Sequence, residues 1–280
     1  MKRMFFNACD LLGLNALFRL LHRGQVKVLL YHSIAEPGGY FNNAVSPEEF
    51  KRQLQHLKAH YNVVSLDGQG EFVGYRADRV NVLITFDDGF VDNFHVAAKL
   101  LRSAQLPATF FLIAACTHDG SPPRFVLNRL SAGEQAPAEA STMTVAQAQS
   151  LLREGMVIGS HGMHHIDYRQ AAQGEGLQDA TLSGADLQQS LGVPVATFAF
   201  PWGRHLPGQP QALLSTYAKV FLTSHGFNAR GDRVLHRNEV ADLAQMRAAC
   251  SGVLDFFSGL LAPAKAIKGL SPNKLRGSHG

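Results

Sequence analysis

The chain has 280 residues, of which 46% are hydrophobic, and a formal net charge of +4 at pH 7. This length fits one large α/β barrel or two small domains, with enough apolar residues for a sizeable core. The mild, scattered positive charge argues against a dedicated nucleic-acid-binding protein. Its three distant cysteines form no Cys-x-x-Cys pair, which argues against a thiolate zinc site or a redox pair.

Residues 1–24 predict an amphipathic helix, because Leu11, Leu14, Phe18 and Leu21 recur at helical spacing. The segment lacks the clean apolar core of a signal peptide and is too polar to span a membrane. We therefore expect a helix packed on the domain or, alternatively, one resting on a membrane surface. The basic residues of that second interpretation are Lys2, Arg3, Arg19 and Arg23.

Beyond residue 25, short apolar runs alternate with helical patterns. Strands are expected at residues 26–32, 63–66, 80–84, 108–113, 156–159, 195–200, 218–223 and 233–240. Helices are expected after Ser46, over residues 91–104, over 144–154 and before Gly192, with a polar helix-like connection before the third strand. This rhythm of about seven strand–helix steps predicts parallel pairing in a single α/β domain, residues 25–262, followed by a basic tail, 263–280.

The pattern breaks over residues 116–141, where prolines and glycines stand among small polar residues. We expect an exposed insertion there, which either forms a lid over the site or is simply mobile.

Two adjacent carboxylates, Asp87 and Asp88, follow the apolar run at residues 80–84 and precede Gly89. Ionised side by side they repel each other, so a metal, a shared proton or solvent must compensate. The carboxyl ends of barrel strands are also where catalytic groups lie. An isolated Asp-Asp-Gly fits a solvated turn equally well, so the interpretation depends on residues further along the chain.

Those residues are His161 and His165, whose spacing on a helical turn would place both imidazoles on one face. Imidazole suits zinc and other late divalent metals, and a carboxylate from Asp87 or Asp88 completes the set at the same rim of the sheet. Two histidines and one carboxylate leave coordination positions open, as in a catalytic site. His164, between them, is expected to point elsewhere.

This set predicts hydrolysis of an amide or ester. One aspartate can bind the metal while its neighbour acts as base towards water. A metal lowers the pKa of water from about 15.7 to about 7 and polarises a carbonyl group.

The motifs resemble those of the polysaccharide deacetylase family, carbohydrate esterase family 4. They are Thr-Phe-Asp-Asp-Gly at residues 85–89, Ser-His-Gly-Met-His-His at 160–165 and Phe-Ala-Phe-Pro-Trp-Gly at 198–203. Residues 29–34, 45–50 and 108–111 are similar to the branch that deacetylates bacterial exopolysaccharides such as poly-N-acetylglucosamine. The likeness covers about residues 26–240 and implies a distorted (β/α)7 barrel, similar to a TIM barrel, in one domain.

The resemblance also implies roles for individual residues. It makes Asp87 the general base. It makes Asp88, His161 and His165 the ligands of a divalent metal, usually zinc, with Co2+, Ni2+ or Fe2+ as alternatives. It places Pro201, Trp202 and Gly203 along the sugar groove, where Trp202 offers a ring face to a sugar.

The chain departs from the family pattern at two points. Where many members carry an arginine that orients the base, this chain has Ala199 or Phe200, with Arg204 just after. The histidine expected as general acid has no clean match, and His236 is favoured over His225. His32, at the end of the first strand, is a further candidate for the substrate site.

These observations predict a metal-dependent hydrolase that removes N-acetyl groups from an amino sugar in a bacterial polysaccharide or glycolipid precursor. One alternative is a cyclic-amide or formamide hydrolase on the same fold. Another is a non-catalytic glycan-binding relative, although such a protein has no need of Asp87. The expected partner is a glycan, the helix at residues 1–24 offers a peripheral membrane contact, and the expected location is the cytoplasm or the inner face of a membrane.

Overall fold

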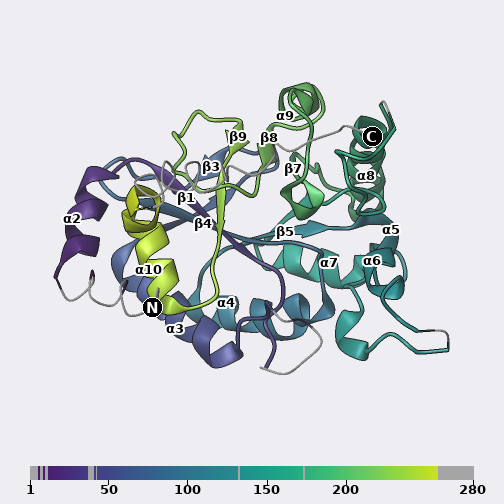
Figure 1. Cartoon of the computed structure of the whole chain (residues 1–280), viewed down its shortest axis with the longest axis horizontal. Coiled ribbons are helices and arrows are strands. Elements are labelled where there is room, and N and C mark those ends of the chain that lie inside the picture. The colour runs from purple at the N-terminus through teal and green to yellow at the C-terminus, as the bar shows by residue number, and fades with distance from the viewer. Residues whose placement is uncertain are drawn as a thin grey trace, which may run out of the picture.

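Figure 1 shows a computed structural model of the chain, which describes residues 6, 9, 12–36, 41, 43–131, 133–172 and 174–257. The expected tail at residues 263–280 lies outside the described residues, as do Lys2, Arg3 and Leu11 of the expected first helix.

A parallel sheet forms the centre of the molecule. Its strands are β1 (Val26–Tyr31), β4 (Asn81–Phe86), β5 (Thr109–Leu112), β6 (Val157–Ser160), β7 (Thr197–Ala199), β8 (Lys219–Phe221), β9 (Val234–Leu235) and β10 (Arg237–Glu239), in the order β10-β1-β4-β5-β6-β7-β8-β9. Only His236 separates β9 from β10, so one stretch of chain pairs with β8 and then with β1. Within the described residues this closes a barrel of seven strand positions, which confirms the predicted distorted (β/α)7 fold.

The barrel is distorted on one side of β4. The first half of β4 pairs with β2 (Asn62–Leu66), whereas its second half pairs with β5. A short hairpin strand, β3 (Phe72–Val73), pairs antiparallel with β2. The expected helix-like connection between β2 and β4 is therefore wrong. Asp67 accepts hydrogen bonds from the backbone amides of Gln69 and Glu71, which favours a turn there.

Helices cover the outside of the sheet (Figure 1). The longer ones are α3 (Pro47–His60), the π-helix η1 (Asn93–Ala97) with α4 (Ala98–Ala104), α7 (Val145–Arg153), α8 (Glu175–Leu191) and α10 (Leu243–Ser251). Shorter ones are α5 (Ala114–Thr117), α6 (Arg124–Leu127), η2 (Ala138–Ala140), η3 (Pro201–Gly203) and α9 (Gln209–Leu213). Ser46 and Thr144 cap α3 and α7 as expected, by accepting hydrogen bonds from Glu49 and Gln147 amides.

Side chains alternate across the strands and form two apolar layers. Val28, Leu83, Phe111, Phe221 and Leu235 belong to one buried cluster, inside the barrel. A larger cluster joins the outward-facing strand residues to the helices and includes Leu29, Ile84, Phe86, Phe50 and Leu101. On β4 the interior cluster includes Leu83, and further along the chain polar side chains such as Asp87 line the carboxyl end of the barrel.

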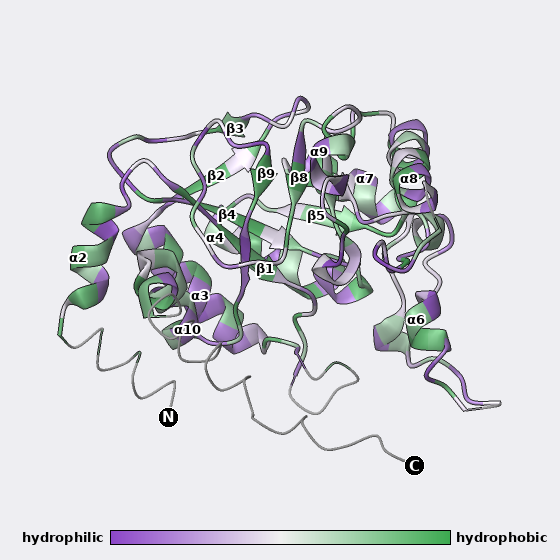
Figure 2. Cartoon of the chain, turned by 45° about the horizontal axis from the view of Figure 1, so that its top comes forward, coloured by the Kyte–Doolittle hydropathy of each residue, from purple (hydrophilic) through white to green (hydrophobic). Residues whose placement is uncertain are grey.

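The first described helix, α2 (Leu14–Leu21), contacts α10. Leu14 and Phe18 pack against Ala248 and Val253, as the interpretation of a packed helix predicts. Leu21 was expected on the same stripe but is 68% exposed. In Figure 2 this helix lies at one edge of the molecule. No helix in the described part of the chain has the length and apolar character to cross a membrane.

Candidate active site

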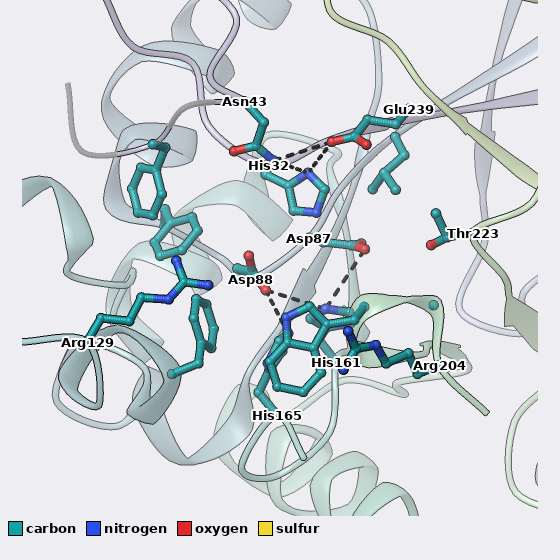
Figure 3. Close-up of a pocket in the computed structure, with 16 residues that line it drawn as sticks. His32, Asn43, Asp87, Asp88, Arg129, His161, His165, Arg204, Thr223 and Glu239 are labelled. Atoms are coloured by element: carbon teal, nitrogen blue, oxygen red, sulfur yellow. Dashed lines mark hydrogen bonds and ion pairs between the residues drawn. The ribbon is translucent and has the colours of Figure 1, made fainter. Parts of the chain in front are cut away.

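A cavity of about 430 Å³ opens at the carboxyl ends of the barrel strands (Figure 3). Its walls come from segments far apart in the sequence. The lining residues are Leu30, His32, Phe41, Asn43, Asp87, Asp88, Phe90, Phe125, Arg129, His161, His165, Trp202, Gly203, Arg204, Thr223 and Glu239. The structure thus brings seven of the nine predicted site residues to one cavity; Pro201 is buried beside it and His236 lies elsewhere.

A sharp backbone turn places Asp87 and Asp88 in this cavity. The amide of Asp87 still donates to Tyr31 O at 2.9 Å, as a continuation of β4. Asp88 and Gly89 then both adopt positive φ, 70° and 69°. A Cβ at Gly89 would lie 2.7 Å from Leu112 Cδ2, so glycine is required for this turn.

Asp88, His161 and His165 form a buried group of potential metal ligands. Asp88 Oδ1 lies 3.4 Å from His161 Nε2 and 3.1 Å from His165 Nε2, and one ligand atom from each residue falls within 4.8 Å of the others. Asp88 Oδ1 is buried and has no hydrogen-bond partner in the described part of the chain. Burial works to raise the pKa of Asp88, but the two imidazoles hold it well below its usual value. This donor set fits a divalent cation.

A backbone contact fixes the ring of His161. Its Nδ1 lies 2.8 Å from Ala199 O, so the ring donates a proton there and leaves the lone pair of Nε2 free for a cation at the ligand group. Ala199 belongs to the motif at residues 198–203, so this motif holds the ring of a residue from the motif at residues 160–165 in place.

His161 and His165 lie in a loop, not on the helical turn expected from their spacing. Gly162 and His165 have φ of 81° and 55°, and this folds the loop back on itself. Asp179 of α8 secures the fold by accepting hydrogen bonds from the Met163 amide at 2.9 Å and from the Tyr168 hydroxyl at 2.7 Å. The two rings thus converge by loop geometry.

Arg237 of β10 forms a bidentate pair with Asp87. Its Nη1 and Nη2 donate to Asp87 Oδ1 and Oδ2 at 2.7 and 2.8 Å, and both residues are buried. Burial works to raise the pKa of Asp87, but the charges of Arg237 and His161 bring it below its usual value. Sequence reasoning missed Arg237 and noted only that the family's arginine position before Pro201 holds Ala199 or Phe200 in this chain. The sequence did hold a signal for Arg237. It lies two residues after the apolar Leu235, so in an extended strand the two side chains share a face, and Leu235 faces the barrel interior.

Arg204, the other arginine near the third motif, does not reach Asp87 as a partner. It donates to Asp167 Oδ2 at 2.8 Å and lies 5.5 Å from the Trp202 ring.

His32 follows β1 and faces the cavity opposite the histidine loop (Figure 3). Its Nδ1 lies 3.4 Å from Glu239 Oε1 and 3.4 Å from Asn43 Nδ2. Burial works to lower the pKa of His32, but the hydrogen bond to Glu239 and the charges of Asp88 and Asp87 raise it to about 8. The direction of this shift favours the imidazolium form of His32. Sequence reasoning missed its partners, Glu239 and Asn43.

His236 and His225 lie outside the cavity lining. Neighbouring residues in a strand face opposite ways, and Arg237 takes the inward place. His236 Nδ1 instead lies 2.7 Å from Ser224 Oγ. The His225 side chain is 56% exposed and lies 2.6 Å from Asn238 Nδ2. These positions do not fit the predicted role of general acid for either histidine.

Trp202 and the segment at residues 116–141 build an aromatic wall. The Trp202 ring lies 4.2 Å from the His165 ring, edge to face, and Trp202 is 44% exposed. Phe125 of α6 lies 4.6 Å from the His165 ring and 6.0 Å from Trp202. The segment expected as a lid or a mobile insertion therefore contributes directly to the cavity.

A family model described as polysaccharide deacetylase matches residues 75–217. The chain belongs to this family. It is a polysaccharide deacetylase, and it carries in Asp88, His161 and His165 a group suited to the divalent metal that such deacetylases use. No curated protein matches the chain.

Solved structures confirm the fold. The deacetylase PplD of Streptococcus pyogenes, solved with acetate, is 23% identical, with a TM-score of 0.65 over 82% of this chain and 97% of that one. IcaB from Ammonifex degensii is 24% identical, with a TM-score of 0.63 over 81% and 97%. The de-N-acetylase from Aggregatibacter actinomycetemcomitans is 20% identical, with a TM-score of 0.63 over 78% and 95%.

Proposed function

We propose that this deacetylase releases acetate from an N-acetylated amino sugar of a bacterial exopolysaccharide or glycolipid precursor, with zinc held by Asp88, His161 and His165. The observation that carries the proposal is the convergence of this ligand group, the Asp87–Arg237 pair and His32 on one cavity. Two imidazoles and a carboxylate are a common catalytic zinc set. Bound there, the ion supplies Lewis-acid polarisation of the acetyl carbonyl and activation of water.

Asp87 acts as the general base. Its carboxylate accepts a proton from the water that adds to the acetyl carbon, and Arg237 keeps it ionised and oriented. Both oxygens of Asp87 accept hydrogen bonds from Arg237. The arginine therefore also fixes the plane of the carboxylate that accepts the proton from water.

His32 acts as the general acid. As the carbon–nitrogen bond breaks, its imidazolium gives a proton to the departing nitrogen, and Glu239 stabilises its charge before the transfer. The products are acetate and the free amine of the sugar. Trp202 offers its exposed ring to a sugar face, and Gly203 brings the backbone close to Thr223.

The test combines metal analysis with acetate release. Purified protein, assayed on N-acetylglucosamine oligomers, should contain zinc and release acetate in a chelator-sensitive way. Asp87→Asn should keep the metal and lose activity, whereas His161→Ala should lose both. Zinc-loaded protein that opens cyclic amides or releases formate, and leaves the oligomers intact, would contradict the sugar assignment. Intact oligomers recovered after tight binding would favour the non-catalytic alternative.

We further propose a peripheral contact between α2 and an anionic membrane surface, which would place the enzyme at the inner face of a membrane. Its support is that Leu17, Leu20 and Leu21 are more than half exposed on the side away from α10. Vesicle co-sedimentation of Leu17→Glu/Leu20→Glu tests it, with Leu182→Glu, an equally exposed leucine on α8, as control. Equal sedimentation of both variants and the parent would contradict the contact.

A further inference from the structure

Arg129 is a charged side chain of the cavity that the chemistry above does not use. It follows α6 and points towards the centre of the cavity in Figure 3. Its guanidinium makes no hydrogen bond or ion pair with any residue that the structure describes. Asp88 belongs to the metal-ligand group, and the other charged lining groups have partners in the pairs Asp87–Arg237, Glu239–His32 and Arg204–Asp167.

The wall that carries Arg129 is well anchored. Its backbone amide donates to Val126 O at 3.0 Å, and Val126 is buried against Phe90 and Ala140. Thr142, at the end of the segment, donates through Oγ1 to Cys116 O and Ser121 O. The guanidinium is therefore presented from an ordered aromatic wall beside Phe125.

We propose that the cavity takes an acidic glycan, in which Arg129 binds a carboxylate or phosphate on the N-acetylated sugar or its neighbour. This inference rests on the proposed deacetylase function and narrows its substrate. The planar fork of arginine matches carboxylate and phosphate groups in two-point contact. Arg129 is exposed, so water solvates its guanidinium in the free enzyme. A neutral glycan that covers it would displace this water from an always-charged group and supply no counter-charge.

The charge balance of the cavity supports the same conclusion. Asp87 is neutralised by Arg237, a divalent ion would more than neutralise Asp88, and Glu239 lies beside His32. Arg204 uses one donor on Asp167 and keeps others beside Trp202, on the opposite side of the His161–His165 group from Arg129 (Figure 3). The loaded site thus has an excess of positive charge, which attracts an anionic substrate.

The test compares zinc-loaded enzyme on three probes: neutral N-acetylglucosamine oligomers, hyaluronan oligosaccharides with alternating glucuronate, and N-acetylglucosamine 1-phosphate. We expect kcat/KM to be about tenfold or more higher for an acidic probe than for the neutral one. This is the size of effect that one hydrogen bond to a charged group gives. Arg129→Gln should remove this preference through KM. Arg124→Gln, which removes the same charge from an exposed position on α6 outside the cavity, should retain it. Preference between the two acidic probes distinguishes carboxylate from phosphate.

Calorimetric binding of the same probes to zinc-loaded Asp87→Asn separates this inference from the proposed function. Binding of an acidic probe that is lost on adding Arg129→Gln, with no acetate released by the parent from any probe, would support the subsite and contradict the deacetylase assignment. Equal kcat/KM for neutral and acidic probes, or identical behaviour of Arg129→Gln and Arg124→Gln, would overturn the inference.

Discussion

Arg237 and Asp87 form two parallel hydrogen bonds across 150 residues of sequence, with both side chains buried. Asp87 directly follows β4 and Arg237 begins β10, so the pair crosses the barrel interior between two strands that are not neighbours. A buried carboxylate in this arrangement stays ionised because its partner is permanently charged.

Arg237→Met should leave the Asp87 carboxylate buried without a counter-charge. We expect the free energy of unfolding to fall by about 3–5 kcal/mol, measured by urea denaturation at neutral pH. The pKa of Asp87 should rise, so the acid limb of the activity profile should move to higher pH. Because the folded-state pKa of Asp87 is depressed in the parent, its stabilisation is present above the unfolded-state value and is lost as pH falls through the folded-state value.

The double variant Asp87→Asn/Arg237→Met provides the control. It removes the unpaired charge and should recover part of the lost stability while remaining inactive. A single Arg237→Met variant as stable as the parent at neutral pH would contradict the pairing.

His32 should set the alkaline limb of the activity profile. Its pKa is raised to about 8, so the proton that it donates is lost as pH rises through about 8. The stability that this proton contributes is complete below the unfolded-state pKa and is lost over the same rise. His32→Gln should lower kcat by about 100-fold or more. Glu239→Gln should move the alkaline limb to lower pH, whereas Glu48→Gln, an exposed glutamate on α3, should leave it in place. A profile unchanged in Glu239→Gln would show that another group is the acid.

Metal binding should stabilise the folded protein. At free zinc about 100 times its dissociation constant, the free energy of unfolding should rise by about 2.7 kcal/mol. Differential scanning calorimetry with and without chelator measures this. His161→Ala should show the same Tm under both conditions, while His164→Ala, exposed between the two ligands, should behave as the parent. A chelator effect that persists in His161→Ala would place the metal elsewhere.

Gly162→Ala should disturb the histidine loop. The new Cβ would lie 2.8 Å from Asp179 Oδ2 and 2.9 Å from the Tyr168 hydroxyl, in addition to the cost of positive φ. Gly192→Ala shares the positive φ but meets nothing within 4 Å, so it should cost only about 1 kcal/mol. Gly162→Ala should cost more and weaken zinc binding, as thermal unfolding and metal titration can show. Equal costs for the two variants would contradict the close packing.

Much of the fold could be predicted because the local signals agree with the tertiary structure. The apolar runs of β4 and β5 are buried on both sides, so they read as strands without alternation. Ser46 and Thr144 mark helix starts through their own hydrogen bonds. The candidate metal group of Asp88, His161 and His165 could be proposed from sequence because few other roles bring these residue types together.

What could not be predicted depends on contacts distant in sequence or on unfavourable backbone conformations. Arg237 and Glu239 acquire their roles only when β10 pairs with β1. Of the four described non-glycine residues with positive φ, three line the cavity: Asp88, His165 and Trp202. Sequence does not favour such conformations, which the surrounding structure imposes at functional sites. The helical turn expected for His165 was wrong for this reason.

The proposed catalytic residues fall into two groups, one inside and one outside the part of the chain that matches the family model. The stretch shared with the family, residues 75–217, contains Asp87 and the three metal ligands. His32 and Glu239 fall outside it. His32 directly follows β1, and Glu239 lies on the neighbouring strand β10, where it pairs with Leu30. On the proposed mechanism, substitutions at β1 and β10 would change the groups that set the pH range of activity without altering the metal-ligand group.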